Sequence, residues 1–234
     1  MIRKLSIWLD SLLQLLYPSH CYGCNRQLII QESFLCSHCL FQLPLTDFHL
    51  EPNNPCFQLL KGRWYIDAAY AMLYLTSQGI TERILYQLKY RKQPQIGRYL
   101  GACYAKVLMN SLDLKQADAL IPVPLHPQKQ RERGYNQSTV FAEGLAQYLH
   151  IPVEKLYLYR KRYTPSQTAL SRQERSENVR DVFVCRRIGD NAKRHFLLVD
   201  DVLTTGATLL SAAEALRKVF PNCRITVVCL AMAK

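Results

Sequence analysis

The sequence predicts an α/β protein with a parallel sheet, preceded by a small cysteine-rich module. Three observations support this prediction. Apolar segments typical of strands alternate with segments of helical periodicity after residue 61, which indicates a parallel sheet covered by helices. Two C-x2-C pairs lie close together near the N-terminus. The chain has 234 residues, which suits one core of ordinary size with a small appendage.

Composition narrows the class of protein. Hydrophobic residues make up 49% of the chain and charged residues 21%, as in globular proteins and unlike disordered, collagen-like or coiled-coil chains. The net charge is +12, from 30 basic and 18 acidic residues. A surplus this large predicts an anionic partner such as nucleic acid, a phosphorylated metabolite or acidic lipid.

The N-terminal 16 residues predict one amphipathic helix that packs on the body of the protein. A secretory signal is a poorer interpretation, because Asp10 and Gln14 interrupt the apolar run and Pro18 ends it. A helix lying on a membrane is the alternative. No later segment has the length of a membrane span. We therefore expect a cytoplasmic chain that is not an integral membrane protein, in a compartment where thiols stay reduced.

The two C-x2-C pairs predict a structural zinc site. Cys21 and Cys24 form the first pair, Cys36 and Cys39 the second, and four thiolates complete the tetrahedral shell that suits Zn²⁺. Gly23 allows a tight turn within the first pair. Free buried cysteines or a redox pair are the alternatives, and an odd total of nine cysteines excludes a fully paired disulfide framework. A closed four-thiolate shell has no open position for catalysis.

The other cysteines receive no metal role. Cys56 stands alone and its role is left open, whereas Cys103, Cys185, Cys223 and Cys229 are expected to be buried small hydrophobes. The stretch from Leu43 to Gly62 is rich in proline and asparagine, and it predicts an irregular linker. The expected domains are therefore residues 1–60, with the N-terminal helix, zinc module and linker, and residues 61–234, the α/β domain.

The remaining elements follow in order along the α/β domain. The continuous apolar run at 196–199 is typical of a strand buried on both faces. Strands are expected at 68–75, 118–124, 156–159, 196–199 and 224–230, and helices at 81–90, 97–112, 137–149 and 207–219.

The stretch from Leu197 to Leu209 predicts a phosphate site beside a sugar site. A buried strand ends in Asp200 and Asp201, and a Thr- and Gly-rich loop then opens a helix. Ligands of open α/β sheets bind outside the carboxyl ends of strands, and free N–H groups at a helix start attract phosphate. The two carboxylates would repel that phosphate, so we expect them to accept hydrogen bonds from neutral sugar hydroxyls. A strand end with a Thr N-cap is the simpler alternative. The expected phosphate-binding residues are Thr204, Thr205, Gly206, Ala207 and Thr208.

This motif resembles the phosphoribosyl-pyrophosphate (PRPP) loop of type I phosphoribosyltransferases, in which two acids precede Thr-Thr-Gly-x-Thr. The match is contiguous, and the expected strand-to-helix context agrees with it. The resemblance implies a type I phosphoribosyltransferase-like domain that binds PRPP with Mg²⁺.

Basic and aromatic residues cluster in three further places. Arg131 and Arg133 lie in a loop between a strand and a helix, and they could hold pyrophosphate or nucleic-acid phosphates. Lys89 belongs to a Lys-Tyr-Arg-Lys cluster and could likewise hold pyrophosphate or nucleic-acid phosphates. The long polar segment from Thr164 to Asn178, with its neighbours, is a candidate lid whose basic residues could close over pyrophosphate and whose Tyr163 could stack on a base. Solvated surface charge is the simpler interpretation of each cluster. The lid residues in question are Arg162, Arg172 and Arg175.

Taken in order, these motifs resemble the ComF/GntX family, the competence protein F group. The shared positions are the paired C-x2-C module, Leu88-Lys89-Tyr90, Pro122-Val123-Pro124-Leu125, Arg133 to Gln137, the segment 164–178 and the loop 200–208. The resemblance implies a role in natural transformation, in which incoming single-stranded DNA is handled inside the cell. It also implies contact with the competence helicase or uptake machinery.

Two functions remain open at this point. The preferred one is a DNA-uptake protein that keeps a PRPP site. The alternative is an active phosphoribosyltransferase with an unknown acceptor, in which Asp200 and Asp201 would be the catalytic residues that hold the ribose hydroxyls. The sequence shows no identifiable nucleobase pocket.

Overall fold

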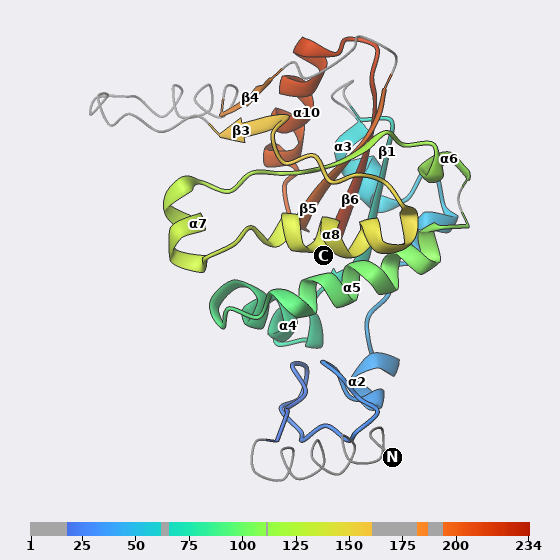
Figure 1. Cartoon of the computed structure of the whole chain (residues 1–234). Coiled ribbons are helices and arrows are strands. Elements are labelled where there is room, and N and C mark those ends of the chain that lie inside the picture. The colour runs from blue at the N-terminus through green and yellow to red at the C-terminus, as the bar shows by residue number, and fades with distance from the viewer. Residues whose placement is uncertain (1–17, 62–65, 111, 161–181, 187–193) are drawn as a thin grey trace, which may run out of the picture.

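The structure is a computed structural model that describes residues 18–61, 66–110, 112–160, 182–186 and 194–234. The N-terminal segment expected to form a helix lies outside these ranges. Within them, no helix combines the length and the apolar character needed to cross a bilayer. A small cysteine-rich module lies at one end of the molecule, and an α/β body forms the rest (Figure 1).

A four-stranded sheet forms the centre of the body, and its strands all run parallel. Its strands are β1 (Ala68–Leu75), β2 (Ala119–Pro122), β5 (His195–Leu203) and β6 (Arg224–Ala233), in the order β1-β6-β5-β2. Residues of β5 and β6 are almost all buried, as expected for central parallel strands. Two short strands, β3 (Leu158–Arg160) and β4 (Phe183–Cys185), pair antiparallel in a second sheet. The predicted parallel α/β class is confirmed.

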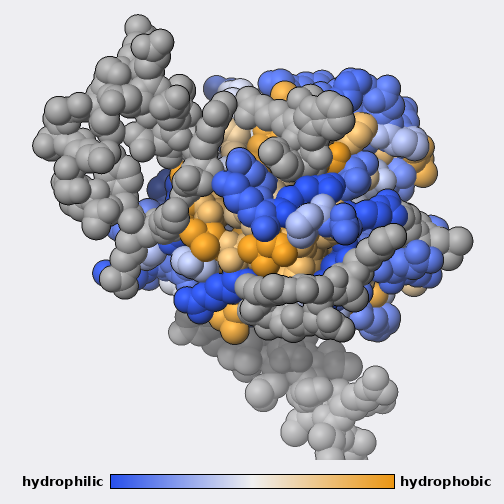
Figure 2. Space-filling view, turned by 90° about the horizontal axis from the view of Figure 1, so that it is seen from above, coloured by the Kyte–Doolittle hydropathy of each residue, from blue (hydrophilic) through white to orange (hydrophobic). Residues whose placement is uncertain are grey.

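Helices cover both faces of the sheet. On one face lie α4 (Ile80–Tyr90), α5 (Pro94–Leu108) and α8 (Gln137–Leu149); on the other lie α3 (Pro55–Leu60) and α10 (Ala207–Val219) (Figure 1). Alternate residues of β5 serve the two cores: Leu197 joins the first and Leu198 the second. Seen from above, apolar residues gather near the centre of the molecule, with hydrophilic residues around them (Figure 2). The shorter helices are α2 (Ser37–Phe41), η1 (Phe48–Leu50), α6 (Leu112–Lys115) and α7 (Pro127–Arg133).

The predicted linker is not irregular over its whole length. Two helices, η1 and α3, form within it, and the backbone N–H of Thr46 donates to the carbonyl of Met72 in β1. The fully buried Asn54 caps α3 through its side-chain oxygen, and its amide nitrogen donates to the carbonyl of Ala69. Leu60 at the end of α3 is also fully buried. The segment therefore packs on the sheet, because its asparagine and leucine find partners that are distant in sequence. The division at residue 60 stays a prediction.

The observed bounds of β5 and α5 differ from expectation. Strand β5 continues to Leu203, so Asp200 and Asp201 lie within the C-terminal part of the strand rather than after its end. Helix α5 starts at Pro94, a residue type that suits the first helical position, and ends at Leu108.

Candidate functional site

The four cysteines of the module converge on one point. One sulfur atom from each of Cys21, Cys24, Cys36 and Cys39 lies within 4.8 Å of the others, and all but Cys24 are buried. Backbone N–H groups point at two of the sulfurs: that of Cys36 donates to Sγ of Cys21 over 3.2 Å, and that of Cys39 to Sγ of Cys36 over 3.4 Å. A Cβ on Gly23 would lie 2.8 Å from Sγ of Cys39, so the turn within the first pair needs glycine.

The charge state of these thiols favours a metal. Burial alone would raise the pKa of the Cys21 thiol, but the N–H groups of Cys36, Cys24 and Gly23 lower it to about 7. Burial and the three neighbouring thiols raise the pKa of Cys39 instead. A divalent ion binds the deprotonated thiolates, so its binding here would release the proton that the raised pKa keeps on Cys39. Four soft ligands within 4.8 Å of one another fit Zn²⁺, and the closed set fits a structural rather than a catalytic ion.

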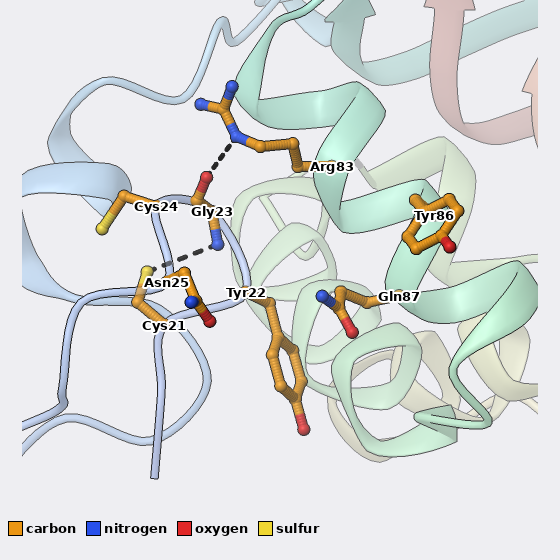
Figure 3. A pocket seen from close by; sticks show the side chains of 8 residues that line it. All are labelled: Cys21, Tyr22, Gly23, Cys24, Asn25, Arg83, Tyr86 and Gln87. Carbon is orange, nitrogen blue, oxygen red and sulfur yellow. Dashed lines mark hydrogen bonds between the residues drawn. The ribbon is translucent and has the colours of Figure 1, made fainter.

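The module is joined to the α/β body through α4. Arg83 of α4 donates from Nε to the carbonyl of Gly23, between the first two cysteines (Figure 3). Leu35 and Cys36 of the module belong to the same buried cluster as residues of α4 and α5. The four-cysteine cluster is therefore fixed against the face of the body formed by α4 and α5.

The two acidic residues of β5 lie in different environments. Oδ1 of Asp200 accepts a hydrogen bond of 2.8 Å from the hydroxyl of Ser138, in the first turn of α8, and only 9% of Asp200 is exposed. Asp201 pairs instead with Lys89 at the end of α4, with 2.9 Å between Nζ and Oδ2. The side chains of this ion pair keep 23% and 17% exposure. Asp201 therefore faces the solvent-accessible side of the site, and Asp200 faces the interior.

Burial and the neighbouring carboxylate of Asp201 raise the pKa of Asp200 to about 7. The hydrogen bond from Ser138, the N–H of Asp201 and the charge of Lys89 act in the opposite direction. A carboxyl group with this pKa is partly protonated near neutral pH. Asp200 can therefore donate as well as accept a hydrogen bond, which suits a partner hydroxyl.

The loop after β5 leaves several polar groups unpartnered. The side chains of Thr204, Thr205 and Thr208 are exposed, and within the described part of the chain their hydroxyls make no hydrogen bond. The first N–H groups of α10 follow directly, and such groups have no acceptor within a helix. Together they form a concentration of donors beside Asp201. This is the arrangement that an anionic group next to a hydroxyl-bearing sugar requires.

Gly206 supports the loop rather than opening it. It caps α10 in the left-handed region, with φ +77°, and a Cβ there would lie 2.5 Å from Cδ2 of Leu60. One side of Gly206 is therefore closed by α3, which the sequence had suggested was part of a linker. A phosphate could reach the loop only from its other side.

Three residues just before and within α8 hold the site together, and sequence reasoning gave them no such role. The hydroxyl of Tyr135 donates to the carbonyl of Leu88 in α4. Asn136 caps α8 by accepting from the N–H of Ser138, and its amide donates over 2.8 Å to the carbonyl of Val123 after β2. An asparagine just before an apolar helix is an N-cap signal that the sequence does contain. The Ser138–Asp200 contact has no local signal.

The predicted basic residues separate in the structure. Lys89 is bound to Asp201. Arg133 donates to Oε1 of Gln137 over 2.7 Å and lies over the ring of Tyr90, whereas Arg131 is exposed on α7 without an ion-pair partner in the described ranges. Arg162, Arg172, Arg175 and Tyr163, with the rest of the candidate lid, lie outside the described residues.

Comparison with known proteins adds a family to this geometry. Residues 136–234 match the phosphoribosyl transferase domain family, a range that contains α8, both acids and the loop. Weaker similarity extends to solved structures: a purine phosphoribosyltransferase from Pyrococcus horikoshii (20% identity, TM-score 0.34, 57% of this chain and 70% of that one) and an orotate phosphoribosyltransferase from Aeropyrum pernix (18% identity, TM-score 0.32, 74% and 80%).

Curated relatives match most of the chain. Competence protein F of Haemophilus influenzae is 30% identical over 204 residues, which cover 85% of this chain and 84% of that protein. The DNA utilization protein YhgH of Escherichia coli K12 is 29% identical over 201 residues, with 84% and 83% covered. Competence protein ComFC of Bacillus subtilis is 31% identical over 98 residues, with 42% and 37% covered. With its four-cysteine cluster and its phosphoribosyltransferase domain, this chain belongs to the family of competence protein F and YhgH.

Proposed function

We propose that this chain handles single-stranded DNA that enters the cell during natural transformation, and that it binds PRPP in the loop after β5. The relatives named for competence and DNA utilization support the first part, and the net charge of +12 agrees with a nucleic-acid partner. The protein acts in the cytoplasm, beside the competence helicase or other parts of the uptake machinery.

One observation carries the PRPP site. At the carboxyl end of a central parallel strand, exposed threonine hydroxyls and the start of α10 lie next to Asp201, which remains partly accessible. The 5′-phosphate would take the N–H groups and hydroxyls of residues 204–208, and Asp201 would accept from a ribose hydroxyl. Asp200, held by Ser138, would position the strand end and take the second hydroxyl. Mg²⁺ would accompany the pyrophosphate group and neutralise part of its charge.

Phosphoribosyl transfer is the second candidate, favoured by the match to the transferase domain family. Lys89 already neutralises a carboxylate at the site, and Lys89 or Arg131 could neutralise leaving pyrophosphate while positive charge develops on the ribose. No residue is assigned as a general acid or base at the reacting carbon. We therefore favour PRPP binding over phosphoribosyl transfer as the function of this site.

Calorimetry with PRPP and Mg²⁺ tests the site directly. Asp201→Asn should weaken PRPP binding about tenfold or more, because it removes a charged acceptor from a sugar hydroxyl. Glu214→Gln is the matched control: it makes the same chemical change on α10, at a residue that pairs with Lys218 on the exposed side. Equal affinity of Asp201→Asn and wild type would contradict the assignment.

Turnover separates the two candidates. Wild-type protein, PRPP, Mg²⁺ and a panel of bases or nucleic acids are incubated, and pyrophosphate release is followed. We expect PRPP binding without release, together with salt-sensitive binding of single-stranded DNA. Release that the double change Asp200→Ala and Asp201→Ala abolishes would instead establish the transferase.

A further inference from the structure

Two exposed tyrosines on α4 form a ring pair. Tyr86 and Tyr90 are four residues apart, a spacing that brings side chains together on one helix face. Their ring centroids lie 5.3 Å apart at an angle of 42°, and the two residues remain 48% and 64% exposed. Neither ring belongs to the two buried clusters of the body, so core packing does not account for this pair. Their exposure therefore needs a different explanation.

Cations flank both rings. The guanidinium of Arg91 lies 5.7 Å from the ring centroid of Tyr86, and that of Arg133 lies 5.7 Å from the centroid of Tyr90. Arg91 follows α4 and Arg133 ends α7, so two separate elements supply the charges. Tyr86, Tyr90, Arg91 and Arg133 are called the stacking strip below. Lys129 and Arg131 are exposed on the same helix as Arg133.

The strip adjoins a cavity of about 520 Å³ between α4 and the cysteine module. Tyr86 belongs to both, and Figure 3 shows it on the same helix as Gln87, opposite the module loop that carries Tyr22. Gln87 lines this cavity with its side-chain amide, beside Tyr22, whose hydroxyl donates over 2.9 Å to Oε1 of Gln93. This volume falls within the roughly 300–1,000 Å³ of small-ligand sites. The lining residues are Cys21, Tyr22, Gly23, Cys24, Asn25, Arg83, Tyr86 and Gln87.

We propose that the stacking strip and this cavity bind unpaired bases of single-stranded DNA, an assignment that rests on the proposed function and gives it a surface. Bases stack on exposed aromatic rings regardless of sequence, while flanking arginines bind the phosphates. One base would leave the strip for the cavity, where the Gln87 amide can reach a base edge. A duplex hides the faces of its bases, so it cannot stack on the tyrosines in this way.

Fluorescence anisotropy with a labelled 20-mer of deoxythymidine tests the strip. Tyr86→Leu and Tyr90→Leu should each weaken binding about tenfold, since each removes one stacking surface. Tyr86→Phe and Tyr90→Phe should each bind with the affinity of wild type, because the aromatic ring is kept. Tyr148→Leu is the matched control: that tyrosine is 37% exposed, with Lys106 over its ring, but it lies on α8. Arg91→Gln and Arg133→Gln should each reduce the salt slope by about 0.7.

The outcomes distinguish the surface from the function. If wild type binds the 20-mer and the double leucine variant binds it equally well, the strip is wrong and the proposed function stands. If wild type binds no single-stranded DNA, both fail. Equal affinity for a duplex of the same length would also overturn stacking. Unchanged PRPP affinity in the leucine variants is expected and shows that their fold is intact.

Discussion

The cysteine module and the loop after β5 both gather polar ligands, but they do so over different sequence distances. All four sulfurs come from a stretch of fewer than twenty residues, and two turns suffice to bring them together. The loop depends on Leu60, Lys89 and Ser138, which come from three different helices. The first site is organised by its ligands and the second by the fold around it. The two should therefore fail in different ways.

Loss of the metal should have the largest effect and should stay local. Cys36→Ala removes a fully buried ligand, and structural zinc contributes roughly 10 kcal/mol or more of folding free energy in small sites. We expect one zinc per chain in wild type and none in the variant, with hydrogen-exchange protection lost over residues 18–42 and kept in β5 and β6. Cys103→Ala, a half-buried cysteine outside the cluster, should keep its zinc. A zinc-free wild type would contradict the metal site.

A methyl group on Gly206 should have the next largest effect. Gly206→Ala would have to adopt φ +77° and would also press on Leu60, so we expect a loss of about 3 kcal/mol in the free energy of unfolding by urea denaturation. Gly134→Ala is the matched control, with φ +82° but nothing within 4 Å of the added Cβ, and it should lose only about 1 kcal/mol. If the two variants lose similar free energies of unfolding, the packing of Leu60 in α3 against Gly206 does not stabilise the loop.

The pKa of Asp200 predicts a smaller, pH-dependent effect. Its folded value of about 7 lies above the ordinary value of 3.8, so the folded chain binds the extra proton between these limits. Wild type should therefore lose stability relative to Asp200→Asn as pH rises from 5 to 7, by at most about 1.4 kcal/mol per pH unit. Urea denaturation of both proteins without ligand measures the difference. A constant difference across this range would contradict the raised pKa.

The junction between the two regions should show the smallest effect. Arg83→Gln removes the hydrogen bond from α4 to Gly23, and such bonds contribute about 1 kcal/mol. Zinc content should stay at one per chain, while exchange of the module amides should become several-fold faster. Unchanged exchange would mean that the other contacts of the module, such as the Phe34–Tyr99 ring pair and the Tyr22–Gln93 hydrogen bond, hold it on the body without Arg83.

Sequence reasoning succeeded where the signal was local. The bounds of β1, α8 and α10 agree with prediction, since each is a long periodic segment ended by its own cap or turn residue. The cysteine cluster was likewise readable from spacing. The segment 43–62 was misread because proline and asparagine indicate a loop, whereas Asn54 is committed to a carbonyl of β1.

The contacts of the acids could not be predicted for a related reason. Ser138 and Asp200 are 62 positions apart in the chain, and the residues around each contain no pattern that predicts their hydrogen bond. Lys89, a candidate for pyrophosphate or nucleic-acid phosphate, pairs with Asp201 in the structure, and no local pattern predicts that pair. Local patterns predict which groups a strand end presents. The packing of α4 and α8 decides which of those groups pair with side chains of the protein, as Asp201 does with Lys89 and Asp200 with Ser138.

The packing of Leu60 against Gly206 has a consequence for the choice of N-terminally truncated fragments of this protein. A shortened version that begins at residue 61 would cut the chain just ahead of the first strand, yet it would delete Leu60, the apolar side chain on which Gly206 and the loop after β5 pack. Such a fragment would expose the apolar side of that loop to water, and a negative ligand-binding result from it would report the deletion rather than the site.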